Sequence, residues 1–203
     1  MSSEVKANKL SPATGTDVVL GDASDTFTIP ASATLDVNGT IDVTGATVTG
    51  LSAGKVLQVV TTKSQALVSS TSLISYETDT PYANTQGVEM LTATITPNAT
   101  ANRLVVVCSL VGTTESGSTP TIALWQDSDT NAIAAANSCT NGTDSGGHIG
   151  LIWEQAAGTT SATTFKIRGG PHSATTFYMN GRNAGVKWGG VPISTLQIWE
   201  IEA

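Results

Sequence analysis

The chain has 203 residues, and its 16 acidic residues against 9 Lys and Arg give a formal net charge of −7. A chain this acidic has no basic patch for phosphate groups, so nucleic acid is excluded as the expected partner. No run reaches 18 apolar residues, which predicts no membrane insertion. Only 12% of the residues are charged, and turn-forming and β-branched residues are abundant, which favours an all-β protein.

The first ten residues, MSSEVKANKL, lack the apolar segment of a secretory signal. We therefore expect a protein that is made in a cytoplasm and does not leave by that route. Residues 17–22 and 26–30 have the pattern of short strands, but the segment has too little apolar surface for a core of its own. Residues 1–30 are predicted to be an extended anchoring arm that packs against another molecule.

Residues 34–50 read TLDVNGTIDVTGATVTG, a degenerate six-residue repeat. Alternating apolar residues indicate strands, and a six-residue period is typical of a β-solenoid. One chain is too short to stack the repeats that such a core needs, whereas three chains suffice. Residues 31–54 are therefore predicted to form a short intertwined triangular β-stem in a homotrimer. Its core residues would be Leu35, Val37, Ile41, Val43 and Val48. The alternative is a plain β-hairpin with a type I′ turn at Asn38-Gly39.

Residues 9–40, KLSPATGTDVVLGDASDTFTIPASATLDVNGT, resemble the start of tailed-phage virion proteins. In that group a lysine-containing SPATGT opening leads through a DTFTIP-like stretch into a trimeric stem rich in Gly and Thr. The resemblance covers about the first fifty residues. It implies a location on the virion surface and synthesis in the cytoplasm of a host bacterium.

Residues 55–203 are predicted to form a β-sandwich knob, because eight or nine short strands recur at regular spacing. The strand 103–111, RLVVVCSLV, is apolar on both faces, which predicts a central strand covered on both sides. One cover would be the partner sheet, and the other a neighbouring subunit. The remaining predicted strands are 56–60, 88–96, 121–126, 132–135, 148–155, 163–169, 175–179 and 195–201, with 72–76 as a weak candidate and one helical turn as the alternative for 132–136.

Three motifs near the C-terminus also resemble the phage group. They are TFKIRGG at 164–170, YMNG at 178–181 and STLQIWEI at 194–201, similar to strands and a turn of fibre-tip knobs. Such knobs are trimeric, with a jelly-roll fold similar to that of tumour necrosis factor. The resemblance implies a homotrimer whose other partners are the major capsid protein or a tail component, with a host surface polysaccharide as a further candidate.

No catalytic or metal site is expected. Residues 127–131, DSDTN, match the first ligands of a calcium loop, but Ala132 stands where such a loop needs Gly, and Ser138 where it needs Glu. They are predicted to be a hairpin tip. His148 and His172 are predicted to be surface residues, since no activated nucleophile accompanies them. The sequence thus predicts neither an enzyme nor a cofactor.

Cysteines and tryptophans complete the candidate residues. Cys108 and Cys139 form no metal-binding motif and are expected to be buried free thiols. Trp125, Trp153 and Trp199 fall within predicted strands and are expected in the core. Trp188 falls in a loop, where an indole with polar neighbours suits a sugar ring. The candidate glycan site is Trp188, Arg182 and Asn183, and the alternative is that Trp188 plugs the end of the knob or the trimer axis.

The sequence and its resemblances together predict a structural spike that decorates or cements a phage capsid and carries an outward knob able to bind glycan. A short tail fibre is the first alternative. A free lectin-like module is the second, although it would not need the arm. A hydrolase would need an acidic or Ser-His cluster, and the sequence shows none.

Overall fold

A computed structural model of the chain describes residues 26, 28–29, 32–34, 36–39, 54–138 and 146–203. Contacts divide the chain into two compact units, Met1–Gly50 and Leu51–Ala203. Within the first unit, residues 32–34 and 36–39 form no strand, and Val37 is 40% exposed. The other predicted stem residues, Leu35, Ile41, Val43 and Val48, lie outside the described residues. The stem and the arm therefore stay predictions.

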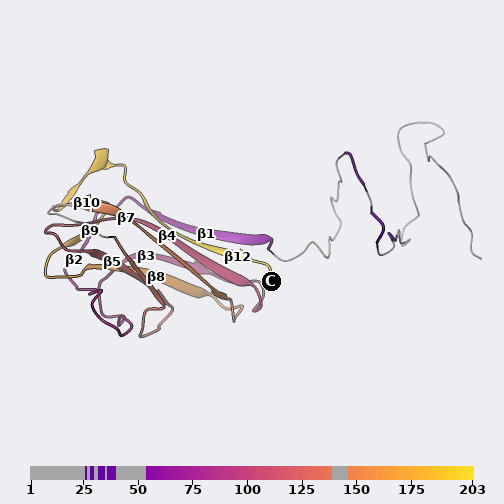
Figure 1. The fold of residues 1–203 in the computed structure, drawn as a ribbon, viewed down its shortest axis with the longest axis horizontal. Coiled ribbons are helices and arrows are strands. Elements are labelled where there is room, and N and C mark those ends of the chain that lie inside the picture. The colour runs from indigo at the N-terminus through magenta and orange to yellow at the C-terminus, as the bar shows by residue number, and fades with distance from the viewer. Residues whose placement is uncertain (1–25, 27, 30–31, 35, 40–53, 139–145) are drawn as a thin grey trace, which may run out of the picture. The chain divides into compact units, whose positions relative to one another are not determined.

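The second unit is built of antiparallel strands in two layers (Figure 1). The strands are β1 Val56–Ser64, β2 Val68–Ser70, β3 Val88–Ile95, β4 Arg103–Thr114, β5 Pro120–Gln126, β6 Ala134–Asn137, β7 Gly146–Ala156, β8 Thr163–Pro171, β9 Phe177–Met179, β10 Gly181–Arg182, β11 Gly185–Val186 and β12 Ser194–Ile201, with a 3-10 turn η1 at Trp188–Gly190.

The pairing of eight of these strands is nested. β1 pairs with β12, β3 with β8, β4 with β7 and β5 with β6, all antiparallel. The first sheet has six strands: β1, β12, β4 and β7 follow in that order, while β9 pairs with the end of β4 and β2 pairs with β9. The second sheet has the order β3-β8-β5-β6. This is how a long hairpin rolls up into a jelly roll, so the prediction of an all-β sandwich of that kind is confirmed.

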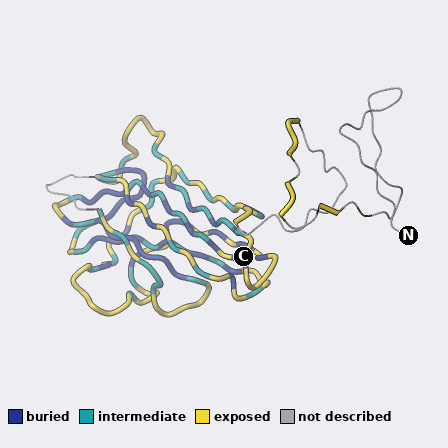
Figure 2. The backbone as a smooth tube through the Cα atoms, turned by 45° about the vertical axis from the view of Figure 1, so that its right-hand side comes forward, coloured by how far each residue is buried: buried dark blue, intermediate teal, exposed yellow. Residues whose placement is uncertain are grey.

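Strict alternation of side chains builds the core between the sheets. Leu104, Val106, Cys108 and Leu110 of β4 are buried, whereas the residues between them are half-buried. β8 and β12 alternate in the same way, and together these inward residues form one apolar cluster. Figure 2 shows this as buried backbone running through both layers. The predicted burial of Cys108 is confirmed, and desolvation raises the pKa of its thiol to about 12.

A long connection between β2 and β3 lies against the outside of the second sheet. We call residues 72–87 the covering segment. Ile74 is fully buried, and its N–H donates to Pro171 O. At the far end of the segment, the backbone of Tyr82 and Asn84 bonds to the chain at residues 130–132. The predicted weak strand at 72–76 is absent, but its residues still pack onto the sheet.

A buried carboxylate fixes the edge strand β1 to the sheet. Glu200 of β12 is fully buried and accepts hydrogen bonds from Gln58 Nε2 at 2.6 Å, Asn102 Nδ2 at 2.6 Å and Asn98 N–H at 2.7 Å. Burial alone would raise the pKa of this carboxyl, but the donors outweigh burial and lower it. Close by, Gly54 N–H donates to Glu202 O, and Glu202 N–H donates to Lys55 O.

The predicted hairpin at 121–135 is confirmed as β5 and β6, and its alternative, a helical turn at 132–136, is wrong. The prediction that Trp199 belongs to the core is also wrong. Trp199 is half-buried and points away from its inward neighbours Ile198 and Glu200. Trp153 packs half-buried against the core as predicted. Cys139 lies outside the described residues. No helix in the described part of the chain is long and apolar enough to cross a membrane.

Candidate functional site

The outer surface of the first sheet carries a group of apolar side chains among polar ones, and we call it the open face. Strand register brings Val59, Trp199 and Val105 side by side, and the next row on this face places Val107 beside Ile152. Val59 is 45% exposed and Ile152 is 73% exposed. The other three are half-buried. The inner cover predicted for the strand at 103–111 is present, whereas the second cover, a neighbouring subunit, stays a prediction.

A Ser-His pair that was not predicted from the sequence lies on the open face. Ser109 Oγ and His148 Nε2 are 2.6 Å apart, on neighbouring strands β4 and β7. Nucleophilic catalysis also needs a group that orients the histidine and donors for an oxyanion. Within residues 54–138 and 146–203, no side chain bonds to His148 Nδ1. The pair is therefore an incomplete catalytic arrangement on a flat, exposed sheet.

The residues of the predicted glycan site occur on one excursion between β10 and β12. Arg182 ends β10 and is half-buried, and Asn183 begins the turn to β11. Asn183 and Ala184 have φ of 49° and 55°, the left-handed pair that a type I′ turn requires. Trp188 follows in η1 at φ 52°, an unfavourable conformation for a bulky residue. The excursion lies at the end of the knob opposite the C-terminus (Figure 1).

Trp188 is 51% exposed in the single chain. Val186, Val191 and Ile193 on the same excursion are 52%, 70% and 44% exposed. Trp188 thus does not plug the end of the isolated knob, while a place at a trimer axis stays a prediction. The role of Trp188, Arg182 and Asn183 in glycan binding is likewise a prediction.

The outer surface of the second sheet is polar, and we call it the polar face. Glu89 of β3 lies opposite Arg168 of β8, and Arg168 lies opposite Ala123 of β5. In the next row, Lys166 lies opposite Trp125. Trp125 is buried as predicted, but it points away from the inter-sheet core formed by Ile122 and Leu124. Arg168, which is bonded to the covering segment at Gln86 and Gly87, lies over its ring.

The hairpin tip at 127–131 contributes to this face without forming a metal centre. Asp127, at φ 47°, accepts a hydrogen bond from Thr164 N–H through Oδ1 at 2.7 Å. This bond fastens the tip to β8. Among the described residues, no group of three or more His, Cys, Asp or Glu side chains is placed to hold a metal ion.

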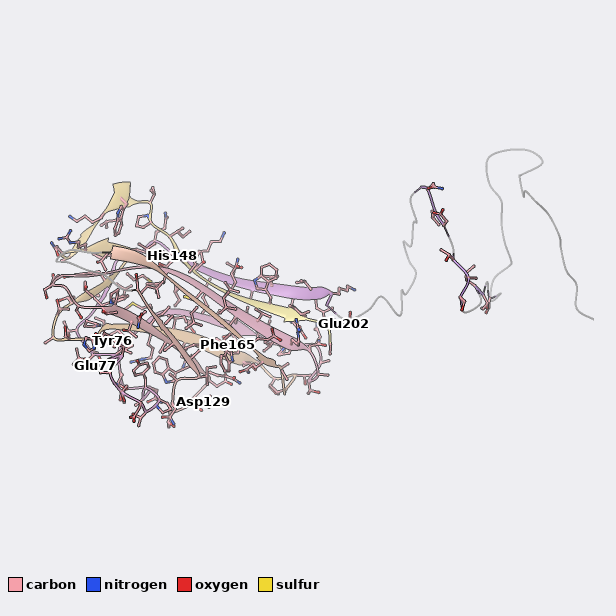
Figure 3. All side chains as sticks on the ribbon, in the orientation of Figure 1. Tyr76, Glu77, Asp129, His148, Phe165 and Glu202 are labelled. Atoms are coloured by element: carbon pink, nitrogen blue, oxygen red, sulfur yellow. The ribbon has the colours of Figure 1, made fainter. Side chains whose placement is uncertain are left out.

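The two histidines have different surroundings. His148 is exposed, as predicted. His172 is only half-exposed, because its ring stacks on Tyr76 of the covering segment with centroids 3.9 Å apart. Its Nδ1 lies 3.1 Å from Ser75 Oγ. Figure 3 shows His148 and Tyr76 on opposite sides of the sandwich. His172 therefore helps to fix the covering segment.

Comparisons with known proteins bear on this fold. No family model matches the chain, and no curated protein does. Among solved structures, the chain is similar to the Eiger TNF of S. frugiperda, with 10% identity and a TM-score of 0.42, over 72% of this chain and 93% of that one. It is also similar to a chain of infectious bursal disease virus, Gx strain, with 16% identity and a TM-score of 0.28, over 72% of this chain and 37% of that one. Likenesses this low assign no function, and the jelly roll is established here by the nested strand pairing.

Proposed function

We propose that this protein is a non-enzymatic, homotrimeric surface spike of a phage virion, in which an N-terminal arm attaches to the capsid and the jelly-roll knob faces outward. The observation that carries the proposal is the open face. Exposed apolar side chains that gather on one surface commonly mark protein contacts, and Val59 and Ile152 of this face are exposed. Copies of the same chain are the partner that the phage-like motifs at both ends of the sequence imply.

The composition of the open face is compatible with a contact between copies. Its centre holds Val105, Val107, Ile152 and Trp199, with Glu154 opposite Val105 and Gln197 opposite Val107. Protein interfaces commonly combine apolar side chains with a few polar ones. The polar face would then remain in contact with solvent.

The placement on the head, as a decorating or cementing spike, rests on the shortness of the chain between arm and knob. A short tail fibre is the alternative placement. In both, the excursion with Trp188 lies far from the end at which the chain enters the knob, where it is available to a host surface.

The first test is the oligomeric state. Mass measurement of the full-length protein at micromolar concentration should give a trimer, and a monomer would overturn the proposal. The second test is placement. Purified protein incubated with tail-less phage heads should bind at hundreds of copies per head. Binding only to particles that carry tails would assign the protein to a fibre instead.

The arm can be tested in the same assay. Protein that lacks residues 2–30 should remain a soluble trimer and lose its binding to heads. Full occupancy by the truncated protein would mean that the knob carries the attachment, contrary to the proposed role of the arm.

A further inference from the structure

The polar face contains a hollow of about 210 Å³ between the covering segment, the hairpin tip and strands β3 and β8. It lies far from the predicted glycan residues in the fold, on the other sheet. Six residues of its lining carry the argument: Asn84, Glu89, Trp125, Asp129, Lys166 and Arg168.

The cationic side chains of this hollow are held in place by the backbone. Arg168 donates from Nε to Gln86 O at 2.8 Å and from Nη2 to Gly87 O at 2.7 Å. Its guanidinium carbon lies 5.9 Å from the centroid of the Trp125 ring. Lys166 donates from Nζ to Asp127 O at 3.2 Å. Because these bonds use only part of each donor set, Arg168 Nη1 and the remaining Lys166 protons are available to a ligand.

The acidic side chains are not used to neutralise these cations. Glu89 and Arg168 are cross-strand neighbours, yet no ion pair joins them in the described structure. The carboxylate of Asp129 likewise has no partner among the described residues. Asn84 donates through Nδ2 to Asp129 O at 3.1 Å, which leaves its own carbonyl oxygen available. The hollow therefore presents donors held by the backbone beside carboxylates that make no ion pair with them.

Trp125 supplies an independent observation. Only 2% of this residue is exposed, and its Nε1 has no hydrogen-bond partner in the described structure. An indole N–H usually finds a partner when it is buried, because leaving it unpaired costs free energy. Trp125 lines the hollow, so its indole N–H reports on a ligand that enters there.

The lining narrows the ligand class. Three carboxylates, those of Glu89, Asp127 and Asp129, disfavour a phosphate or another anion. Two cationic groups disfavour a metal ion or an amine. The polar lining disfavours an apolar ligand. Hydroxyl groups remain, since each one donates and accepts at once, and a vicinal pair can bridge a carboxylate and a guanidinium.

We propose that this hollow binds a single saccharide unit, through its hydroxyl groups, between Glu89, Asp129, Lys166 and Arg168. Trp125, which lines the hollow, would contribute wall contact. The site is on the sheet opposite the open face, so association of copies through the open face would leave it accessible. The proposal that the hollow binds a saccharide depends neither on the virion role nor on trimer formation.

The test uses the full-length protein and a panel of methyl glycosides of glucose, galactose, mannose and N-acetylglucosamine, titrated to 10 mM by NMR. At least one should shift the indole N–H signal of Trp125, which a Trp125→Phe variant identifies. Free monosaccharides, and trisaccharides that end in the same sugars, are titrated in the same way. They show whether the hollow binds a free sugar or a chain end more tightly. Binding of either kind supports the proposal.

Glu89→Gln and Asp129→Asn should each weaken the best-binding sugar at least tenfold. Glu202→Gln, the same change of charge at an exposed residue that does not line the hollow, should leave it unchanged. The proposal is overturned if no sugar binds by 10 mM, if the two variants bind as the parent does, or if glycine or inorganic phosphate binds in place of the sugars.

Discussion

The two outer surfaces of the knob differ in how far their apolar side chains are exposed. On the first sheet, Val59 and Ile152 remain exposed and Val105 and Val107 are half-buried. On the second sheet, residues 72–87 lie against the outer side, where Ile74 and Trp125 are buried. That a neighbouring subunit covers the first sheet stays a proposal. The open face carries the case for assembly, and the polar face carries the case for ligand binding.

The largest effect is expected from a charge placed in the open face. Val107 lies in a central strand, between Gln197 and Ile152. Val107→Asp would bury an unpaired charge at the contact of each copy, and we expect association to weaken at least a hundredfold, about 3 kcal/mol. Sedimentation should then give a folded monomer. Ala135→Asp, the matched change on the exposed side of β6, should remain trimeric. A Val107→Asp protein that stays a trimer would contradict the proposal that copies associate through the open face.

The second effect concerns the carboxylate that holds β1, and with it the edge of the open face. Glu200→Gln keeps the shape of the side chain but removes the negative charge that accepts three hydrogen bonds. We expect it to lower the free energy of unfolding by about 1.5–3 kcal/mol. Because the folded-state pKa of Glu200 is lowered, its stabilisation is complete above about pH 4.3 and is lost as the pH falls through the folded-state value.

Denaturant unfolding between pH 7 and pH 3 should therefore show a stability difference between parent and Glu200→Gln that narrows as the pH falls. Glu202→Gln, two residues on and exposed, is the control and should follow the parent throughout. A difference that is constant with pH would mean that the charge of Glu200 is not what stabilises the edge.

The third effect concerns the cover on the polar face. A Cβ at Gly170 would collide with Ser72 O and press on Ile74, both in the covering segment. Gly170→Ala should displace the segment and cost about 1–3 kcal/mol, as overpacking does. Hydrogen exchange should rise for Ile74 N–H, which bonds to Pro171 O.

Gly150 on the open face is the matched position, because a Cβ there meets nothing within 4 Å. Gly150→Ala, made in the Val107→Asp background so that the face is free, should be neutral or slightly stabilising. Equal losses of unfolding free energy for Gly150→Ala and Gly170→Ala would mean that the two faces do not differ in how tightly they are covered.

The smallest effect is expected from the ion pair on the open face. Arg103 Nη1 and Glu154 Oε1 are 3.4 Å apart, and both side chains are about half exposed. Water screens such a pair, so a double-mutant cycle in the Val107→Asp monomer should give a coupling of about 0.2–1 kcal/mol. The same cycle in the trimer should give a larger coupling if a second copy excludes water from the pair. Equal values would place the pair outside the contact.

The sequence predicted strands well where side chains alternate. The strands at 103–111 and 195–201 were predicted close to β4 and β12, because apolar residues recur at every second position. β1 was predicted to end at Val60, yet it runs to Ser64, since Thr and Ser continue the alternation without an apolar signal. β2, with only three residues in a Ser-rich stretch, was missed for the same reason.

Which face a residue occupies was less predictable, because it depends on register between distant strands. Trp199 has the composition of a core residue, but a shift of one position relative to Ile198 puts it on the open face. The hollow near Trp125 was missed entirely. Residues 120–126 read as one apolar run, and only the pairing of β5 with β8 and β3 brings Lys166, Arg168 and Glu89 to its outer side.

The bonds near Gly54 and Glu202 determine how the knob would carry a pulling force. Tension arriving through the preceding chain enters β1 at Val56, and the excursion with Trp188 is at the far end of the knob. A load between those two ends runs along the strands, so the β1–β12 hydrogen bonds from Val56 to Ser64 share it in shear. A load applied between Val56 and the C-terminus, which lie together, would instead open the same bonds one after another. The knob should therefore resist a load between its two ends better than a load between Val56 and the C-terminus.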